Sequence, residues 1–281
     1  MDKLKVASAF GHAASRYNHF AQVQQRILEW SLSHVPPLAR ANDSSLSASD
    51  PTCIVDLGCG TGRAIPALSK MAEKVIALDI AQPMLDVAAE QYSYINNIQY
   101  QCADFDQLSL HFQPHSIQCL FSSMSLQWSE SPQTLIQSIA GVLSKSGSAH
   151  LTILIAPSFS RLKLAWKSIG RGHAVHDFAS LPNWLAAIKQ AGLSVEYAQE
   201  TFIDFYPDFS SMLHSIKGVG AHTPDTVTGG HQSLQEQQVR LSKRQLKQAR
   251  AAFLALNKGH FSLDYNVVQL HLRHRTSVRG F

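Results

Sequence analysis

The sequence lacks the long apolar runs that a membrane protein needs. Its uncharged apolar stretches, such as Leu151–Ile155, fall far short of the roughly 18 to 20 residues that a membrane-spanning helix requires. The segment after Met1 also lacks the apolar stretch that follows the charged start of a secretory signal. We therefore expect neither a transmembrane helix nor an export signal.

Cysteine is scarce, and its spacing excludes two common uses. Cys53, Cys59, Cys102 and Cys119 lie singly in apolar segments, without a C-x-x-C pair or a histidine at zinc-ligand spacing. Neither a disulfide framework nor a structural zinc site is expected, and no other metal site is predicted. Reduced thiols in a cytoplasmic protein are the expected state.

Charged residues make up only 16% of the 281 residues, against 45% apolar residues, which is typical of a globular chain of one large or two small domains. Acids are rarest near the C-terminus, where Asp264 is the single acid from Arg240 onward. This basic excess predicts either a docking surface for an acidic partner or a solvated helix face followed by a disordered terminus. The candidate docking residues are Arg240, Lys243, Arg244, Lys247 and Arg250.

Short apolar runs alternate with helical patterns along the chain. The apolar runs predict strands over Cys53–Leu57, Val75–Asp79, Ile98–Cys102, Ile117–Ser122, Ala149–Ile155, Leu193–Phe205 and Tyr265–Leu272. Helical spacing predicts helices over Ala64–Met71, Pro83–Gln91, Thr134–Leu143, Phe159–Ile169, Trp184–Gln190, Asp208–Ile216 and Ser242–Leu256. Apolar strands that alternate with helices indicate an α/β, Rossmann-like fold with a mostly parallel, seven-stranded sheet covered on both faces.

These elements divide the chain into four predicted parts. Residues 1–50 would form an N-terminal helical arm and a polar linker, and residues 51–207 the cofactor-binding core. Residues 208–260 would form a helical cap inserted between the last two strands. Residues 261–281 would supply the last strand and a basic tail.

The strongest local signal is the glycine-rich sequence after the first predicted strand. Asp56-Leu57-Gly58-Cys59-Gly60-Thr61-Gly62 leads into a helix, and its glycines permit positive φ and close approach of backbone N–H groups to a ligand. Asp79 ends the next strand, where a carboxylate can bind both hydroxyls of a ribose. The dinucleotide fingerprint G-x-G-x-x-G would need glycine at position 63, which is Arg63. A nucleoside cofactor of another kind is therefore expected.

The D-x-G-x-G-x-G spacing resembles the loop of class I S-adenosylmethionine-dependent methyltransferases, and Ala103-Asp104-Phe105 resembles their adenine-binding acid segment. The resemblance implies S-adenosylmethionine as the cofactor. The residues that it places around this cofactor are Tyr17, Gln24, Asp56, Gly58, Cys59, Gly60, Gly62, Asp79, Ile80, Met84, Ala103, Asp104, Phe105 and Ser122. Two alternatives remain. The segment is a purely structural turn in which Asp56 caps the helix, or the protein is a nicotinamide-dependent oxidoreductase.

Three further segments resemble the malonyl-acyl-carrier-protein O-methyltransferases of biotin synthesis. They are Ala9–Tyr17 with Ala21 and Gln24, Phe121–Trp128, and Ser215–Ala221. The resemblance implies methylation of the free carboxylate of a malonyl thioester on acyl carrier protein or coenzyme A, an early step of pimeloyl synthesis. It also implies that an acidic carrier protein binds the C-terminal basic residues, with no membrane or nucleic acid as partner.

The resemblance places six residues at the substrate, namely Tyr17, Gln127, Trp128, His173, His176 and Lys217. Lys217 would pair with the malonyl carboxylate, and His173 or His176 would donate a hydrogen bond to it. From the residues alone, Lys217 is equally a cation at a helix end, the histidines are polar loop residues, and Trp128 is a packed loop anchor.

The chain departs from the family pattern at the substrate side. Ser122-Ser123 stands where the family has Ser-Asn, Gln118 stands where Asp is usual, and His173–Phe178 matches the His-x-Asn-x-Phe segment only loosely. Two alternatives therefore stay open. One is a methyltransferase of the same fold that acts on another small acid, another nucleophile or tRNA; the other is a non-catalytic S-adenosylmethionine-binding protein.

Overall fold

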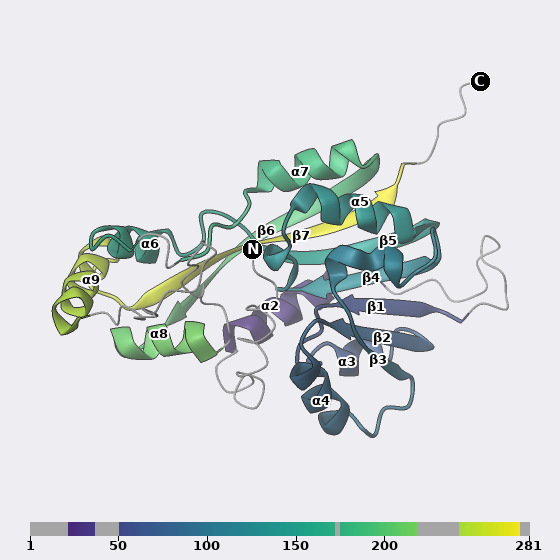
Figure 1. The fold of residues 1–281 in the computed structure, drawn as a ribbon, viewed down its shortest axis with the longest axis horizontal. Coiled ribbons are helices and arrows are strands. Elements are labelled where there is room, and N and C mark those ends of the chain that lie inside the picture. The colour runs from purple at the N-terminus through teal and green to yellow at the C-terminus, as the bar shows by residue number, and fades with distance from the viewer. Residues whose placement is uncertain (1–21, 37–50, 172–174, 219–241, 276–281) are drawn as a thin grey trace, which may run out of the picture.

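A seven-stranded sheet runs through the computed structural model, which describes residues 22–36, 51–171, 175–218 and 242–275 (Figure 1). Its strands are β1 (Cys53–Leu57), β2 (Lys74–Asp79), β3 (Ile98–Cys102), β4 (Ile117–Ser123), β5 (Leu143–Leu154), β6 (Leu193–Phe205) and β7 (Ser262–His274). The order is β3-β2-β1-β4-β5-β7-β6, and all pairs are parallel except the two that β7 forms, with β5 and with β6. The predicted mostly parallel sheet is confirmed. Chain order reverses between β1 and β4, which in open α/β sheets creates a binding crevice at the carboxyl ends of the strands.

Helices cover both faces of this sheet, as the sequence predicts. One face packs against α5 (Pro132–Val142), α7 (Leu181–Gln190) and the 3₁₀ helix η1 (Phe105–Leu110). The other face packs against α2 (Gln22–Ser33), α3 (Ile65–Leu68) and α4 (Gln82–Gln91). Within β2, Ile76 and Leu78 belong to the first core, whereas Val75 belongs to the second. Burial on both faces explains why these strands are apolar throughout.

Local signals fix several helix starts. Ser131 caps α5 by accepting a hydrogen bond from the Thr134 N–H, with Pro132 in the first turn. Ser242 and Gln245 form a capping box at the start of α9 (Lys243–Leu256). The helix predicted over Ala64–Met71 is shorter in the structure, where regular helix covers only Ile65–Leu68. The strand β5 begins at Leu143 rather than Ala149, because Leu143 already pairs with Ile117 across a bulge.

The cap is built on a pair of strands that is longer than its neighbours. β6 and β7 pair from Leu193↔His274 to Phe205↔Ser262, whereas β5 pairs with β7 only as far as Leu154↔Val267. On the extension pack α6 (Ser160–Lys167), α8 (Phe209–Gly218) and α9, at the left of Figure 1. Their shared core contains the buried Trp166, Phe209 and Phe253. The predicted insertion of α8 and α9 between the last strands is confirmed; the four-part division stays a prediction.

Helix α2 lies where the cap meets the sheet. Its Val23 and Ile27 belong to the cap core, and its Leu28 belongs to a core of the sheet. A buried cluster of hydroxyl and amide groups fixes the helix to β5 and β7: the Thr152 hydroxyl donates to Ser31 Oγ (2.5 Å) and also to Gln269 Oε1. The preceding part of the predicted arm, residues 3–21, lies outside the described residues.

Two predicted absences concern the membrane and the thiols. Across the described ranges, no helix combines the length and apolarity needed to cross a bilayer. Cys53, Cys59, Cys102 and Cys119 all lie in the described part of the chain, and all are free thiols.

Candidate cofactor and substrate site

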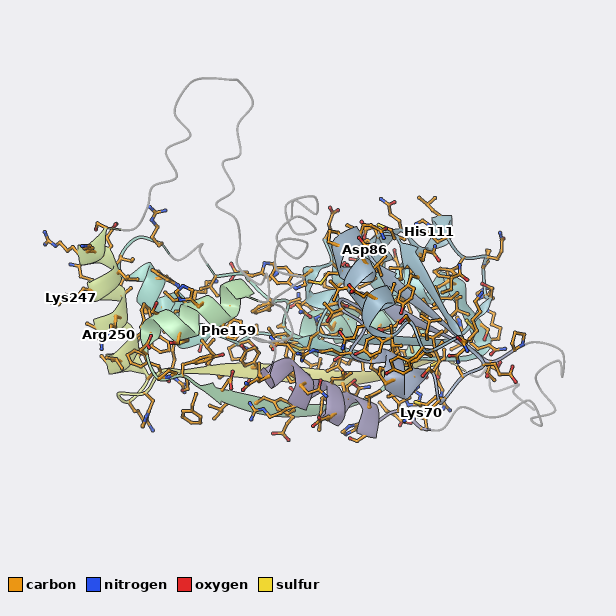
Figure 2. All side chains as sticks on the ribbon, turned by 90° about the horizontal axis from the view of Figure 1, so that it is seen from below. Lys70, Asp86, His111, Phe159, Lys247 and Arg250 are labelled. Atoms are coloured by element: carbon orange, nitrogen blue, oxygen red, sulfur yellow. The ribbon has the colours of Figure 1, made fainter. Side chains whose placement is uncertain are left out.

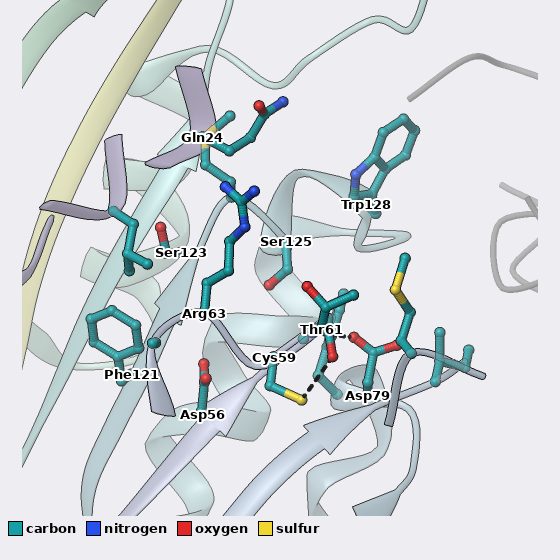
Figure 3. A pocket seen from close by; sticks show the side chains of 18 of the residues that line it. Gln24, Asp56, Cys59, Thr61, Arg63, Asp79, Phe121, Ser123, Ser125 and Trp128 are labelled. Atoms are coloured by element: carbon teal, nitrogen blue, oxygen red, sulfur yellow. Dashed lines mark hydrogen bonds between the residues drawn. The ribbon is translucent and has the colours of Figure 1, made fainter. Parts of the chain in front are cut away.

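A pocket lies at the carboxyl ends of β1, β2 and β4, at the point where strand order reverses (Figure 3). α2 contributes Gln24 and Leu28 to its wall. The remaining lining residues are Asp56, Gly58, Cys59, Gly60, Thr61, Arg63, Ala64, Asp79, Ile80, Met84, Asp104, Phe105, Phe121, Ser123, Met124, Ser125 and Trp128.

The three glycines after β1 have positive φ for different reasons. A Cβ on Gly60 (φ +56°) would meet no atom within 4 Å, so this residue leaves open space in the pocket wall. A Cβ on Gly62 (φ +81°) would lie 2.7 Å from Ile65 Cδ1, so Gly62 serves packing beneath the loop. At Gly58 (φ +69°) a Cβ would lie 2.4 Å from Ser125 Cβ. At Gly58 and Gly62 only glycine combines the positive φ with such close approach, whereas at Gly60 the positive φ alone favours glycine.

Asp79 is held by the backbone of the glycine loop. Its Oδ2 accepts a hydrogen bond from Gly60 N–H and its Oδ1 accepts one from Ala81 N–H, both at 2.8 Å. Burial raises the pKa of Asp79, although these hydrogen bonds oppose the shift. The carboxylate is thus fixed at the end of β2, beside the open space at Gly60.

Asp56 is the second-last residue of β1 and is a buried acid. Burial, followed by the charge of Asp79, raises the pKa of Asp56 to about 8. Its Oδ2 is buried and has no hydrogen-bond partner among the described residues, and the same holds for Gln24 Oε1. The described pocket lining carries three acidic side chains, Asp56, Asp79 and Asp104, and one cation, Arg63. The raised pKa of Asp56 means that this acid ionises most readily when a cation binds beside it. Such a pocket favours a positively charged ligand with groups that donate hydrogen bonds.

The far wall of the pocket is the turn after β4. The hydroxyls of Ser122 and Ser125 both donate to Leu57 O at 2.7 Å. Between them Met124 has φ +59°, a left-handed conformation that costs a non-glycine residue about 1–2 kcal/mol. Its N–H donates to Thr152 O (2.9 Å), and Gln127 Nε2 donates to its carbonyl (2.6 Å). The strained turn is therefore held from both sides.

A row of rings leads from this turn into the cap. Trp128 lies 5.0 Å from His176, and His176 lies 5.0 Å from Phe178 (ring centroids). Phe178 in turn contacts Phe159, which packs on Tyr265. Burial lowers the pKa of His176, although a hydrogen bond to the Gln127 backbone opposes the shift. The imidazole is thus mainly neutral at pH 7, and its single N–H faces the Gln127 backbone.

The structure brings many of the predicted site residues together in one pocket. Those that line it are Gln24, Asp56, Gly58, Cys59, Gly60, Asp79, Ile80, Met84, Asp104, Phe105 and Trp128. Four predicted cofactor or substrate residues lie behind the lining: Gly62 packs on Ile65, Ala103 is buried, Ser122 binds Leu57 O, and Gln127 binds Met124 O. His176 reaches the pocket only through Trp128, a lining residue whose ring it contacts.

The other predicted residues fall beyond what the structure describes. Tyr17, His173 and Arg240 lie outside the described residues. Lys217 is in the last turn of α8, but its side chain is outside the described part.

Sequence reasoning missed eight lining residues: Leu28, Thr61, Arg63, Ala64, Phe121, Ser123, Met124 and Ser125. Signals for most of them exist. Leu28 follows Gln24 by one helical turn, and Thr61, Arg63 and Ala64 continue the glycine loop. Phe121 and Ser123–Ser125 belong to a segment already singled out for its resemblance. No sequence signal reveals the left-handed backbone of Met124.

The predicted docking residues on α9 form an exposed basic face. Lys243, Arg244, Lys247 and Arg250 are exposed, and the sequence of α9 contains no acid. Lys243 and Arg244 are in the first turn, where a cation opposes the helix dipole. Arg250 lies over the Phe261 ring (5.5 Å). Figure 2 shows Lys247 and Arg250 at the end of the molecule opposite Asp86 and His111.

Known proteins resemble this chain over most of its length. Residues 55–151 match the family described as "Methyltransferase domain". The malonyl-[acyl-carrier protein] O-methyltransferase of Marinomonas sp. (strain MWYL1) is 31% identical over 222 residues, covering 78% of this chain and 77% of that protein. The biotin biosynthesis bifunctional protein BioHC of Cellvibrio japonicus is 31% identical over 240 residues, covering 84% of this chain and 45% of that protein. The chain thus spans about half the length of such bifunctional relatives.

Solved structures share the fold at low sequence identity. The YcgJ protein of Bacillus subtilis superposes with a TM-score of 0.61 at 16% identity, covering 89% of this chain and 99% of that chain. A putative methyltransferase of Haloferax volcanii, in complex with the Trm112 activator, gives a TM-score of 0.57 at 17% identity, covering 96% and 99%. At this identity the likeness shows the fold alone.

Proposed function

This chain belongs to the malonyl-[acyl-carrier protein] O-methyltransferase family, and we propose that it methylates the free carboxylate of a malonyl thioester with S-adenosylmethionine, in an early step of biotin synthesis. Its fold is that of the class I methyltransferases. The observation that carries the proposal is the pocket at the switch point, where Asp56, Asp79 and Asp104 surround an open glycine loop.

The pocket residues fit S-adenosylmethionine. Its positive charge suits a lining with three carboxylates, and its ammonium and hydroxyl groups can donate to the unpartnered Asp56 Oδ2 and Gln24 Oε1. Asp79 would hold the ribose, while Asp104 and the neighbouring Phe105, Ile80 and Met84 would hold the adenine side. The cradle at Gly60 leaves room that a Cβ would fill.

When bound, S-adenosylmethionine supplies a methyl group on a positively charged sulfur, and transfer of that group to a carboxylate oxygen forms a methyl ester. A malonyl carboxylate has an ordinary pKa of about 4, so it is ionised at neutral pH and needs no general base. The protein therefore has to remove water from the anion and orient it. Leu28, Phe121, Met124 and Trp128 supply apolar surface to the pocket lining.

Hydrogen-bonding groups would orient the carboxylate without burying it in a tight ion pair. His176 is mainly neutral at pH 7 and its ring contacts Trp128, and it would serve if its N–H turned from the Gln127 backbone to the carboxylate. His173 and Lys217 are the further candidates from the sequence, and Tyr17 would cover the cofactor with Gln24. A weak, directional donor leaves the oxygen nucleophilic, which favours the imidazole over the ammonium group.

The carrier of the malonyl group would dock on the basic face of α9. Acyl carrier proteins are acidic, and Lys243, Arg244, Lys247 and Arg250 offer complementary charge on one exposed helix. Two of these cations stand at the helix end where the dipole disfavours them. Their presence there is explained by a partner rather than by the stability of α9. Malonyl-CoA is the alternative thioester.

A methyl-transfer assay tests the proposal. Purified protein with S-adenosylmethionine is expected to convert malonyl-acyl-carrier protein to its methyl ester, detected by mass spectrometry. Succinyl and acetyl thioesters, free malonate and unmodified tRNA serve as competing acceptors. Growth rescue of a strain that lacks this biotin step is expected as well. Cofactor binding without turnover of any malonyl thioester would refute the proposal and favour a binding protein.

A further inference from the structure

The turn after β4 holds Met124 in a conformation that its own sequence disfavours. Met124 has φ +59°, and left-handed backbone in non-glycine residues is concentrated at functional sites, where surrounding contacts enforce it. No glycine or asparagine stands at this position. Contacts around the turn must therefore stabilise the left-handed backbone conformation, because methionine itself disfavours it.

Three elements supply these contacts. β5 accepts the Met124 N–H at Thr152 O (2.9 Å), and the Gln127 side chain donates to Met124 O (2.6 Å). Ser125, the next residue, donates to Leu57 O at the end of β1 (2.7 Å). Thr152 itself is part of the buried cluster with Ser31 and Gln269 that fixes α2. Hydrogen bonds thus connect the turn to the start of the glycine loop, through Leu57, and to α2, through Thr152 and Ser31.

The Met124 side chain lies where the two halves of the molecule meet. It lines the pocket, and it also packs against the core of the cap. Gln127, in contrast, is not part of the pocket lining, and its Oε1 is buried without a partner among the described residues. Its amide group is therefore used for one purpose, the hydrogen bond that it donates to Met124.

We propose that Met124 faces the methyl acceptor and that Gln127 is a positioning residue that fixes Met124 in its left-handed conformation. The proposal rests on the methyl transfer proposed above. It assigns Gln127 to the geometry of the pocket wall and not to a contact with the substrate. Removal of the amide donor would free the turn and misplace the acceptor while leaving the nucleoside side of the pocket intact.

Gln127→Met tests this assignment, since it keeps the length of the side chain and removes the donor. It is expected to lower kcat about tenfold and to leave the dissociation constant of S-adenosylhomocysteine unchanged in calorimetry. Met124→Gly is expected to lower kcat by at least as much, and Met124→Leu by less. The double variant should lose no more than Met124→Gly alone, because Gln127 acts through Met124.

Hydrogen exchange gives a readout that does not need activity. The Met124 amide should exchange faster in Gln127→Met than in the wild type. The matched control is Gln133→Met, which removes a donated hydrogen bond to Gln190 on the exposed side of α5; it should change neither exchange nor kcat. Additive losses in the double variant, wild-type exchange in Gln127→Met, or weaker cofactor binding in parallel with kcat would each overturn the proposal. If the wild type methylates no malonyl thioester, the proposed function fails, and the exchange experiment still decides the role of Gln127.

Discussion

The cofactor pocket and the cap of this molecule carry opposite charge. The described pocket lining has Asp56, Asp79 and Asp104 against Arg63, whereas α9 exposes a basic face without any acid. The acids of the pocket are buried or half-buried, and Asp79 and Asp104 are held by hydrogen bonds from backbone N–H groups. The cations of α9 are exposed and screened by solvent.

This difference separates two binding tasks. A buried carboxylate has a fixed geometry and can recognise a small cation in detail. An exposed basic face gives long-range attraction and partner choice with little geometric demand. Changes in the pocket should therefore affect the cofactor and leave the partner untouched, and changes in α9 should do the reverse.

The largest effect is expected at the pocket. Asp79→Ala should weaken S-adenosylmethionine binding at least about 100-fold, because it removes a charged acceptor for both the ribose and the loop amides. Isothermal calorimetry measures the loss. Asp86→Ala, on the exposed side of α4, is the control. Tight binding by Asp79→Ala would refute the ribose role.

Two glycines of the same loop should separate stability from binding. Gly62→Ala places a Cβ 2.7 Å from Ile65 Cδ1 at φ +81°, and we expect a loss of about 3 kcal/mol in the free energy of unfolding. Gly60→Ala meets no atom and should lose only about 1 kcal/mol but bind the cofactor less well. Urea unfolding and calorimetry measure the pair. Equal stability losses would contradict the packing role of Gly62.

On the cap, reversal of Arg244, Lys247 and Arg250 to glutamate should lower kcat/KM about 10- to 100-fold for carrier-linked malonate. For a small malonyl thioester the change should stay within about twofold, because the pocket is intact. The carrier effect should shrink at high salt. Reversal of the exposed Lys70, Lys145 and Lys189 is the control with the same charge change. Equal losses on both substrates would show that α9 is not a docking surface.

The smallest effect is a pH dependence confined to the pocket. The pKa of Asp56 is raised to about 8, and a cationic ligand favours the ionised form, so cofactor affinity should rise about tenfold between pH 6.5 and 8.5 with release of a proton. In the same range the unliganded protein should lose stability with rising pH, because the folded state binds this proton more tightly than the unfolded chain. Asp56→Asn should abolish both trends. Calorimetry in buffers of different ionisation enthalpy measures the proton release.

The sequence predicts the pocket better than the cap for a physical reason. Buried parallel strands are apolar throughout, and pocket-lining residues such as Asp79 and Asp104 stand at or just after their ends, so linear spacing translates into position. The helix α6 is predicted as a helix, but its place on the β6–β7 extension depends on contacts far apart in sequence. Helical periodicity does not carry that information.

Two residues in the segment after β4 have side-chain partners that the sequence does not reveal. The sequence predicts Ser122 at the cofactor, and the structure shows its hydroxyl donating to Leu57 O on the neighbouring strand β1. Gln127 was expected at the substrate, yet it supports Met124. Both residues belong to the right segment. The direction of the Ser122 side chain is set by a partner on another strand, and that of Gln127 by the backbone of the neighbouring Met124, whose left-handed conformation the sequence does not reveal.

The unbroken pairing of β6 with β7 has a mechanical consequence. One ladder, from Leu193↔His274 to Phe205↔Ser262, supports the parallel sheet at one end and α6, α8 and α9 at the other. The pairing of these two strands is continuous, so α6, α8 and α9 are attached to the sheet through a rigid two-stranded extension. We expect the cap to reorient through a change in the twist of the β6–β7 pair. Rotation about a hinge between the cap and the sheet is not expected.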